Sequence, residues 1–197
     1  MRPLEPRFRW PRVPRSSLLE RTARRLWCVP TGFVGRFAAA LVTSGEGIPV
    51  QGALTRAKLY PLCRSWASLG AIALGDIVLY SPAFLRRHDA AAVIAHELAH
   101  TQQHHVLGPF YLPLHGIAQS ISAILSLLHR GPVQHSRVHD FNPLEQTFIH
   151  IGVGCIAPLA RGELLSAERR DELYALYGLT PSVLERLESS LSPLAAV

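Results

Sequence analysis

The chain contains 197 residues, of which 48% are hydrophobic and 17% charged, with a formal net charge of +6. This is enough apolar material for one domain with a sizeable core and appendages at its ends. Cys28, Cys63 and Cys155 are odd in number and far apart, which argues against a disulfide framework, and no Cys-x-x-Cys pair is present for a structural zinc.

The positive charge is concentrated at the N-terminus, where residues 1–25 hold eight arginines against two glutamates. Arginine and proline at this density cannot bury enough apolar surface to fold alone. We therefore expect a mobile arm over residues 1–25 and a single domain over residues 26–197. Such an arm favours anionic surfaces, such as lipid head groups, although a tail without a partner is at least as good an interpretation. Zinc-finger spacing and a recognition-helix pattern are both missing, so we do not expect nucleic-acid binding.

The sequence contains no clear signal peptide. A secretory signal needs an uninterrupted apolar stretch after the basic residues, but residues 26–42 include Pro30, Gly32, Gly35 and Arg36. We expect a cytoplasmic protein, or one peripheral to the inner face of the membrane.

The first predicted elements are a helix over residues 29–42 and then short strands. Residues 48–54, 58–60 and 72–80 have the composition of strands and predict a small antiparallel sheet. Helices follow the sheet, which is the order of an α+β fold.

A helix is predicted over residues 89–107. Asp89 is a suitable N-cap, alanines of high helix propensity follow it, and Gly108-Pro109 is a stop signal.

Residues 96–100 of that helix read His-Glu-Leu-Ala-His. Histidines four apart lie on one helix face, about 6 Å apart along the axis, so His96 and His100 can bind one metal ion. Glu97 points to a different side and can act as general base on a metal-activated water.

Apolar and acidic helices are predicted downstream. Residues 101–129 contain no formally charged side chain, and a helix over 111–129 has polar residues that favour a buried or membrane-surface position over a spanning one. A shorter apolar stretch over 148–160 is expected in the core. Acidic helices are predicted over residues 166–177 and 181–191.

Catalytic zinc normally takes three protein ligands, so a third is required. The metzincin pattern is excluded because it needs glycine at position 103 and histidine at 106, where this chain has Gln103 and Val106. His104 lies about 12 Å from His96 along the helix axis, which is too far to share the ion. We expect it to be a neighbour of the site or an exposed histidine.

The best third ligand is Glu145, near the start of a helix predicted over residues 143–158. Asn142 as N-cap and Pro143 at the first helical position explain this glutamate equally well as a capping residue, and the two roles are compatible. Asp140 is the alternative ligand, or an outer-shell partner of a zinc histidine. The weaker candidates are His135, His139 and His150.

The chain from about Val29 to Gly178 resembles a family of small uncharacterised bacterial proteins, zinc metallopeptidases of the gluzincin type by their motifs. The segments that carry the resemblance are Gly75–Tyr80, Ala95–Gln103, Gly108–Pro113 and Asp140–Glu145. The resemblance implies a zincin-like fold and assigns Glu145 as the third ligand. It also implies that residues 75–80 bind an extended peptide by edge pairing.

These observations predict a Zn²⁺-dependent metallopeptidase, with a peptide or protein as its substrate. An amidase acting on a non-peptide bond and a non-catalytic protein that binds a membrane or partner are the alternatives. A group that stabilises the oxyanion is also expected. The unranked candidates are Tyr80, Tyr111, His115 and His139.

Overall fold

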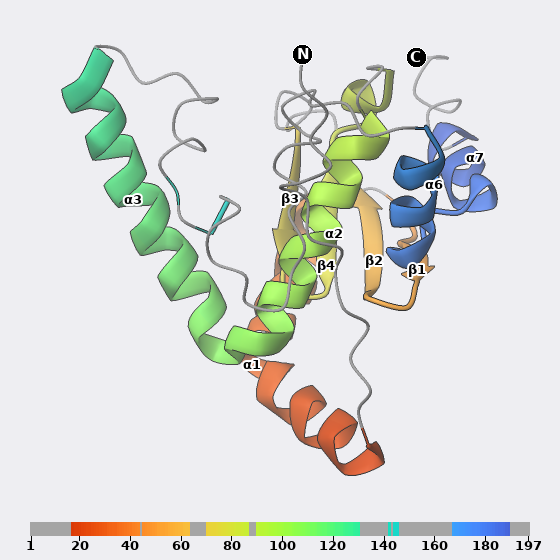
Figure 1. Ribbon diagram of the computed structural model, residues 1–197, viewed down its shortest axis with the longest axis horizontal. Coiled ribbons are helices and arrows are strands. Elements are labelled where there is room, and N and C mark those ends of the chain that lie inside the picture. Colours follow the sequence, from red (N-terminus) through yellow and green to blue (C-terminus); the bar gives the residue numbers. More distant parts are fainter. Residues whose placement is uncertain are drawn as a thin grey trace.

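The computed structural model describes residues 17–43, 45–63, 70–86, 90–130, 142, 144–145 and 167–189. The elements are labelled as in Figure 1. The α-helices are α1 (Leu18–Val42), α2 (Ala90–Leu107), α3 (Tyr111–Arg130), α6 (Ala167–Leu176) and α7 (Pro181–Ser189). The strands are β1 (Ile48–Gln51), β2 (Arg56–Pro61), β3 (Ala71–Leu74) and β4 (Ile77–Tyr80). Two short 3-10 helices are η2 (Pro82–Arg86) and η3 (Gly108–Phe110).

The strands form one sheet in the order β1-β2-β4-β3. The prediction of an antiparallel sheet is wrong for its central pair, since β2 and β4 run parallel, while β1 with β2 and β3 with β4 are antiparallel. The strand expected over residues 72–80 is instead a hairpin, turned at Gly75 with a φ of 73°. β3 runs opposite to β2, and the hairpin reverses the chain again, so β4 runs parallel to β2.

Side chains from other elements cover β4 on both faces of the sheet. Val78 and Tyr80 point into the main core, together with Ile94 and Leu98 of α2 and residues of α6 and α7. Ile77, on the opposite face, packs in a smaller core with α1. All four residues of β4 are therefore buried. The fold is mixed α/β with mainly helical content, and α2 crosses the sheet (Figure 1).

The helix predictions agree closely with the structure around the motif. α2 ends at Leu107, and Gly108 has a φ of 56°, so the predicted stop is confirmed. The C-terminal helices are present, over slightly shorter ranges than expected. α1, by contrast, begins at Leu18, so residues 18–25 are helical rather than part of an arm. Leucine, alanine and arginine are good helix formers, and this part of the arm prediction is wrong.

Several predictions lie outside the described residues. They are the arm over residues 1–16, Asp89, Asp140, the apolar stretch 148–160 and most of the helix expected over 143–158, of which Leu144 and Glu145 are seen in a turn.

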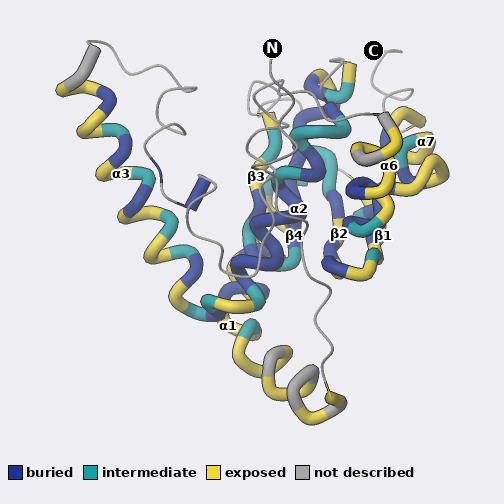
Figure 2. Tube along the Cα trace, in the orientation of Figure 1, coloured by how far each residue is buried: buried dark blue, intermediate teal, exposed yellow. Residues whose placement is uncertain are grey.

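Within the described part of the chain, one helical stretch, Ala90–Leu128, is long and apolar enough to cross a membrane. Core helices of soluble proteins can meet the same criterion. In this fold α3 extends away from the sheet, and much of its surface is exposed (Figure 2).

Candidate metal centre

The i, i+4 spacing on α2 brings the two motif histidines together. His96 Nε2 and His100 Nε2 lie 3.1 Å apart. The carboxylate of Glu145 reaches both from the loop after α3, with its Oε2 atom 2.8 Å from His96 Nε2 and 3.1 Å from His100 Nε2. His100 and Glu145 are buried and His96 is half-buried, so the structure brings together the three predicted ligands.

This donor set fits a zinc ion. Two imidazole nitrogens and one carboxylate oxygen are the ligands of many catalytic zinc sites, at about 2.0–2.2 Å from the metal. The three atoms form a triangle with sides of 2.8 and 3.1 Å, small enough for a single point to lie at zinc distance from all of them. With three protein ligands, the fourth position of a tetrahedral zinc ion is available to a water molecule.

Gln103, one turn beyond His100, links two of the ligands. Its side-chain oxygen lies 2.7 Å from His100 Nδ1, and its amide nitrogen donates to the carbonyl oxygen of Leu144 at 2.8 Å. The amide oxygen can only accept, so Nδ1 of His100 carries a proton, and Nε2 turns its lone pair toward the metal position once its own proton is lost. The same amide holds the backbone next to Glu145.

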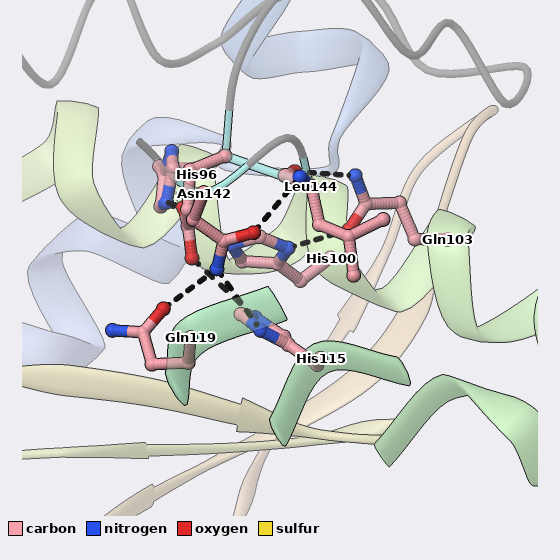
Figure 3. Close-up of polar contacts among 8 residues, drawn as sticks. His96, His100, Gln103, His115, Gln119, Asn142 and Leu144 are labelled. Atoms are coloured by element: carbon pink, nitrogen blue, oxygen red, sulfur yellow. Dashed lines mark hydrogen bonds and ion pairs between the residues drawn. The ribbon is translucent and has the colours of Figure 1, made fainter. Parts of the chain in front are cut away.

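Asn142 shapes the loop that carries the third ligand. Its side-chain oxygen accepts from the backbone N–H of Leu144 at 2.9 Å, and its carbonyl oxygen accepts from the N–H of Glu145 at 3.0 Å. Its amide nitrogen donates to Gln119 of α3 at 2.6 Å, and these contacts converge in Figure 3. A buried asparagine that closes a turn therefore fixes the loop against α3.

Of the candidates for oxyanion stabilisation, the structure brings His115 to the site. His115 Nε2 lies 3.4 Å from Glu145 Oε1. Tyr111 is fully buried beside it, with ring centroids 5.6 Å apart, and the Tyr111 hydroxyl has no hydrogen-bond partner among the described residues. Tyr80 packs in the main core, and His139 lies outside the described residues.

Glu97 is buried beside the three ligand side chains. Burial raises the pKa of its carboxyl group, although the charges of His100 and His96 act in the opposite direction, as does a hydrogen bond with the backbone of Ala73. A raised pKa makes a carboxylate a stronger base near neutral pH. Its contact with β3 orients Glu97 on the sheet side of α2.

His104 is a buried neighbour of the site and not an exposed residue. Its Nε2 atom is hydrogen-bonded to the hydroxyl of Thr31 on α1. Burial, followed by the charge of His105, lowers the pKa of His104 to about 4, so this imidazole is neutral. It stabilises the packing of α1 on α2.

The sequence provided no clear signal for Gln103 and Gln119, because glutamine is ordinary on a helix surface. Their position one turn after a ligand and one turn after His115 is the only local clue. The rival ligands Asp140, His135 and His150 lie outside the described residues.

Zinc affinity is expected to rise with pH up to about 9. Burial alone would lower the pKa of His100, but the charge and hydrogen bond of Glu145 raise it to about 9, so zinc must displace a proton below that pH. Titration with chelator-buffered zinc should show about a tenfold gain per pH unit from 7 to 9. A flat profile would contradict this geometry.

The same pKa shift affects the stability of the metal-free protein. The contribution of protonated His100 to folding stability is fully present below pH 6.5 and is lost as pH rises through about 9.

Replacing Gln103 with leucine is expected to lower zinc affinity by about 10–100-fold, because the outer partner of a zinc histidine is lost. Gln102→Leu is the matched control. Gln102 is also buried on α2, but it bonds to Leu54 and Tyr177, away from the ligands. Competition with a chelating dye measures both affinities. Equal losses in the two variants would show that Gln103 has no specific role.

Comparisons with models of protein families, with curated proteins and with solved structures found no match to this chain. The function must therefore be argued from the arrangement of the site itself.

Proposed function

We propose that this protein is a zinc-dependent metallopeptidase of the gluzincin type, which hydrolyses peptide bonds. The observation that carries the proposal is the convergence of His96, His100 and Glu145 within 3.1 Å, beside the buried carboxylate of Glu97. A three-ligand centre with an adjacent general base is typical of zinc hydrolases rather than of structural zinc sites, which use four protein ligands.

A zinc ion bound by these residues would acidify a water molecule and polarise the carbonyl group of the substrate. Glu97 accepts the proton of the attacking water and then delivers it to the nitrogen of the leaving amine. Its raised pKa suits both transfers, since the group must take up and release a proton in one cycle.

His115 and Tyr111 are the groups suited to stabilise the developing oxyanion. His115 lies beside both Glu145 and His100, with its ring centroid 5.1 Å from that of His100, and its side chain is 20% exposed. The Tyr111 hydroxyl is buried without a described partner, and the charges of Glu97 and Glu145 both act on it. A donor near the reacting carbonyl is the arrangement that the chemistry requires.

The substrate would lie along β3. Sequence resemblance pointed to residues 75–80, but β4 is paired on both sides, and β3 is the edge strand beside α2 among the described strands. An extended peptide can pair with such an edge. Because the backbone of Ala73 contacts Glu97, a peptide bound there would pass the general base.

Metal content and chelation test the proposal. We expect the purified full chain to hold about one zinc ion, to cleave members of a peptide library, to lose this activity on chelation and to regain it with added zinc. A parallel library of non-peptide amides distinguishes a peptidase from an amidase. A protein purified without zinc that also fails to bind added zinc would exclude the enzyme.

A further inference from the structure

The polarity of α3 is the reverse of that expected for a helix on a protein surface. Its buried face carries polar side chains, including Ser122 and Ser126, and His115 and Gln119 contact the loop of the third ligand. Its exposed face is apolar at helical spacing, and its members are Leu114, Ile117, Ile121, Ile124, Leu125 and Leu128. A surface helix in water normally directs its apolar stripe toward the core. The outer face of α3 is therefore suited to an apolar environment.

α1 has a second exposed apolar face. Leu26, Phe33, Phe37 and Leu41 are exposed at intervals of seven and four residues, so they lie on one side of the helix. Trp27 of α1 contacts Phe110 of η3, directly before α3, with ring centroids 5.9 Å apart. α1 therefore approaches the start of α3, and both helices extend beyond the sheet (Figure 1).

The distribution of exposed apolar side chains is uneven over the described residues. Every large exposed hydrophobic side chain lies on α1, at the end of α2, on η3 or on α3, with the exception of Ile72. Scattered exposed hydrophobic residues are ordinary, but a concentrated apolar surface marks an interaction site.

The charges of the same helices are almost all positive. Residues 101–129 hold no Asp, Glu, Lys or Arg, and α3 ends at Arg130. α1 has four arginines and one glutamate, and the residues before it are also rich in arginine. Apolar side chains with flanking arginines are complementary to an anionic lipid surface. A second copy of the chain would bring a like-charged surface against this one.

We propose that the exposed faces of α1 and α3 bind an anionic lipid bilayer, with the apolar side chains in the acyl region and the exposed arginines of α1, Arg25 and Arg36, at the head groups. α3 keeps its polar face on the protein and lies along the membrane rather than across it. The metal centre, which α3 contacts through His115 and Gln119, is then held beside the bilayer.

Co-sedimentation of the full chain with vesicles tests this proposal. Ile117 and Ile121 are 58% and 51% exposed, so the double variant Ile117→Glu/Ile121→Glu changes the lipid-facing surface without removing core contacts. We expect it to lower partition into phosphatidylcholine vesicles containing phosphatidylglycerol by at least about tenfold. Ile72→Glu, at 46% exposure on β3, is the matched control and should bind as the unmodified chain does. Pure phosphatidylcholine vesicles should bind more weakly.

A second measurement keeps the proposal testable if the double variant fails to fold. In a chain with Trp27 as its sole tryptophan, anionic vesicles should shift the emission to shorter wavelength, and lipids brominated on their acyl chains should quench it. Absence of binding and of quenching would overturn the proposal. So would a dimer in lipid-free buffer that Ile117→Glu/Ile121→Glu converts to a monomer, because the apolar faces would then bind each other. Neither assay uses a substrate, so the result is independent of the proposed hydrolysis.

Discussion

Replacing Glu97 with glutamine is expected to lower the rate of peptide hydrolysis by about 10²–10⁴-fold while zinc remains bound. Glutamine has nearly the shape of glutamate but cannot accept the proton of the attacking water. Glu97 is buried beside the ligands, so bulk water cannot take its place as the base. Because the metal ligands are unchanged, the loss should appear in kcat, with little change in the zinc content measured by elemental analysis.

Glu172→Gln provides the matched control, since it removes an exposed carboxylate from α6 by the same chemical change. It should leave both zinc content and hydrolysis unaltered. If Glu97→Gln retained full activity with zinc bound, Glu97 could not be the general base, and His115 would be the next candidate.

The parts of the site that lie within one helix could be predicted from the sequence. The spacing of His96 and His100 defines a shared face once α2 is recognised, and Gly108 defines the end of that helix. Both depend on residues a few positions apart, so a local pattern is sufficient.

The parts that depend on distant contacts could not be predicted in the same way. The hairpin at Gly75 places β4 beside β2, and nothing in the strand sequences distinguishes this order from an antiparallel meander. The sequence leaves His115 as one of four unranked candidates, and only the packing of α3 brings it to Glu145. Gln103 and Gln119 acquire their roles only from the loop that they hold.

The pairing of Glu145 with α2 is also a long-range contact, and its removal is the second large expected effect. Glu145→Ala should weaken zinc binding by more than about 100-fold, because even outer partners of zinc ligands contribute about 10–100-fold. Asp140→Asn separates the alternatives. If Asp140 is not a ligand, that variant keeps its zinc, as measured by competition with a chelator. Loss of zinc from Asp140→Asn together with retention of zinc in Glu145→Ala would make Asp140 the third ligand.

A measurement without metal tests the same contact independently. Burial favours neutral His100, and it is chiefly the charge of Glu145 that raises its pKa to about 9. In metal-free Glu145→Gln that charge is absent while the burial remains, so the pKa of His100 should fall well below 9. Titration followed by NMR of the imidazole protons reports this change. An unchanged pKa would show that Glu145 does not face His100, whereas the expected fall would place the carboxylate at the metal position without any reference to activity.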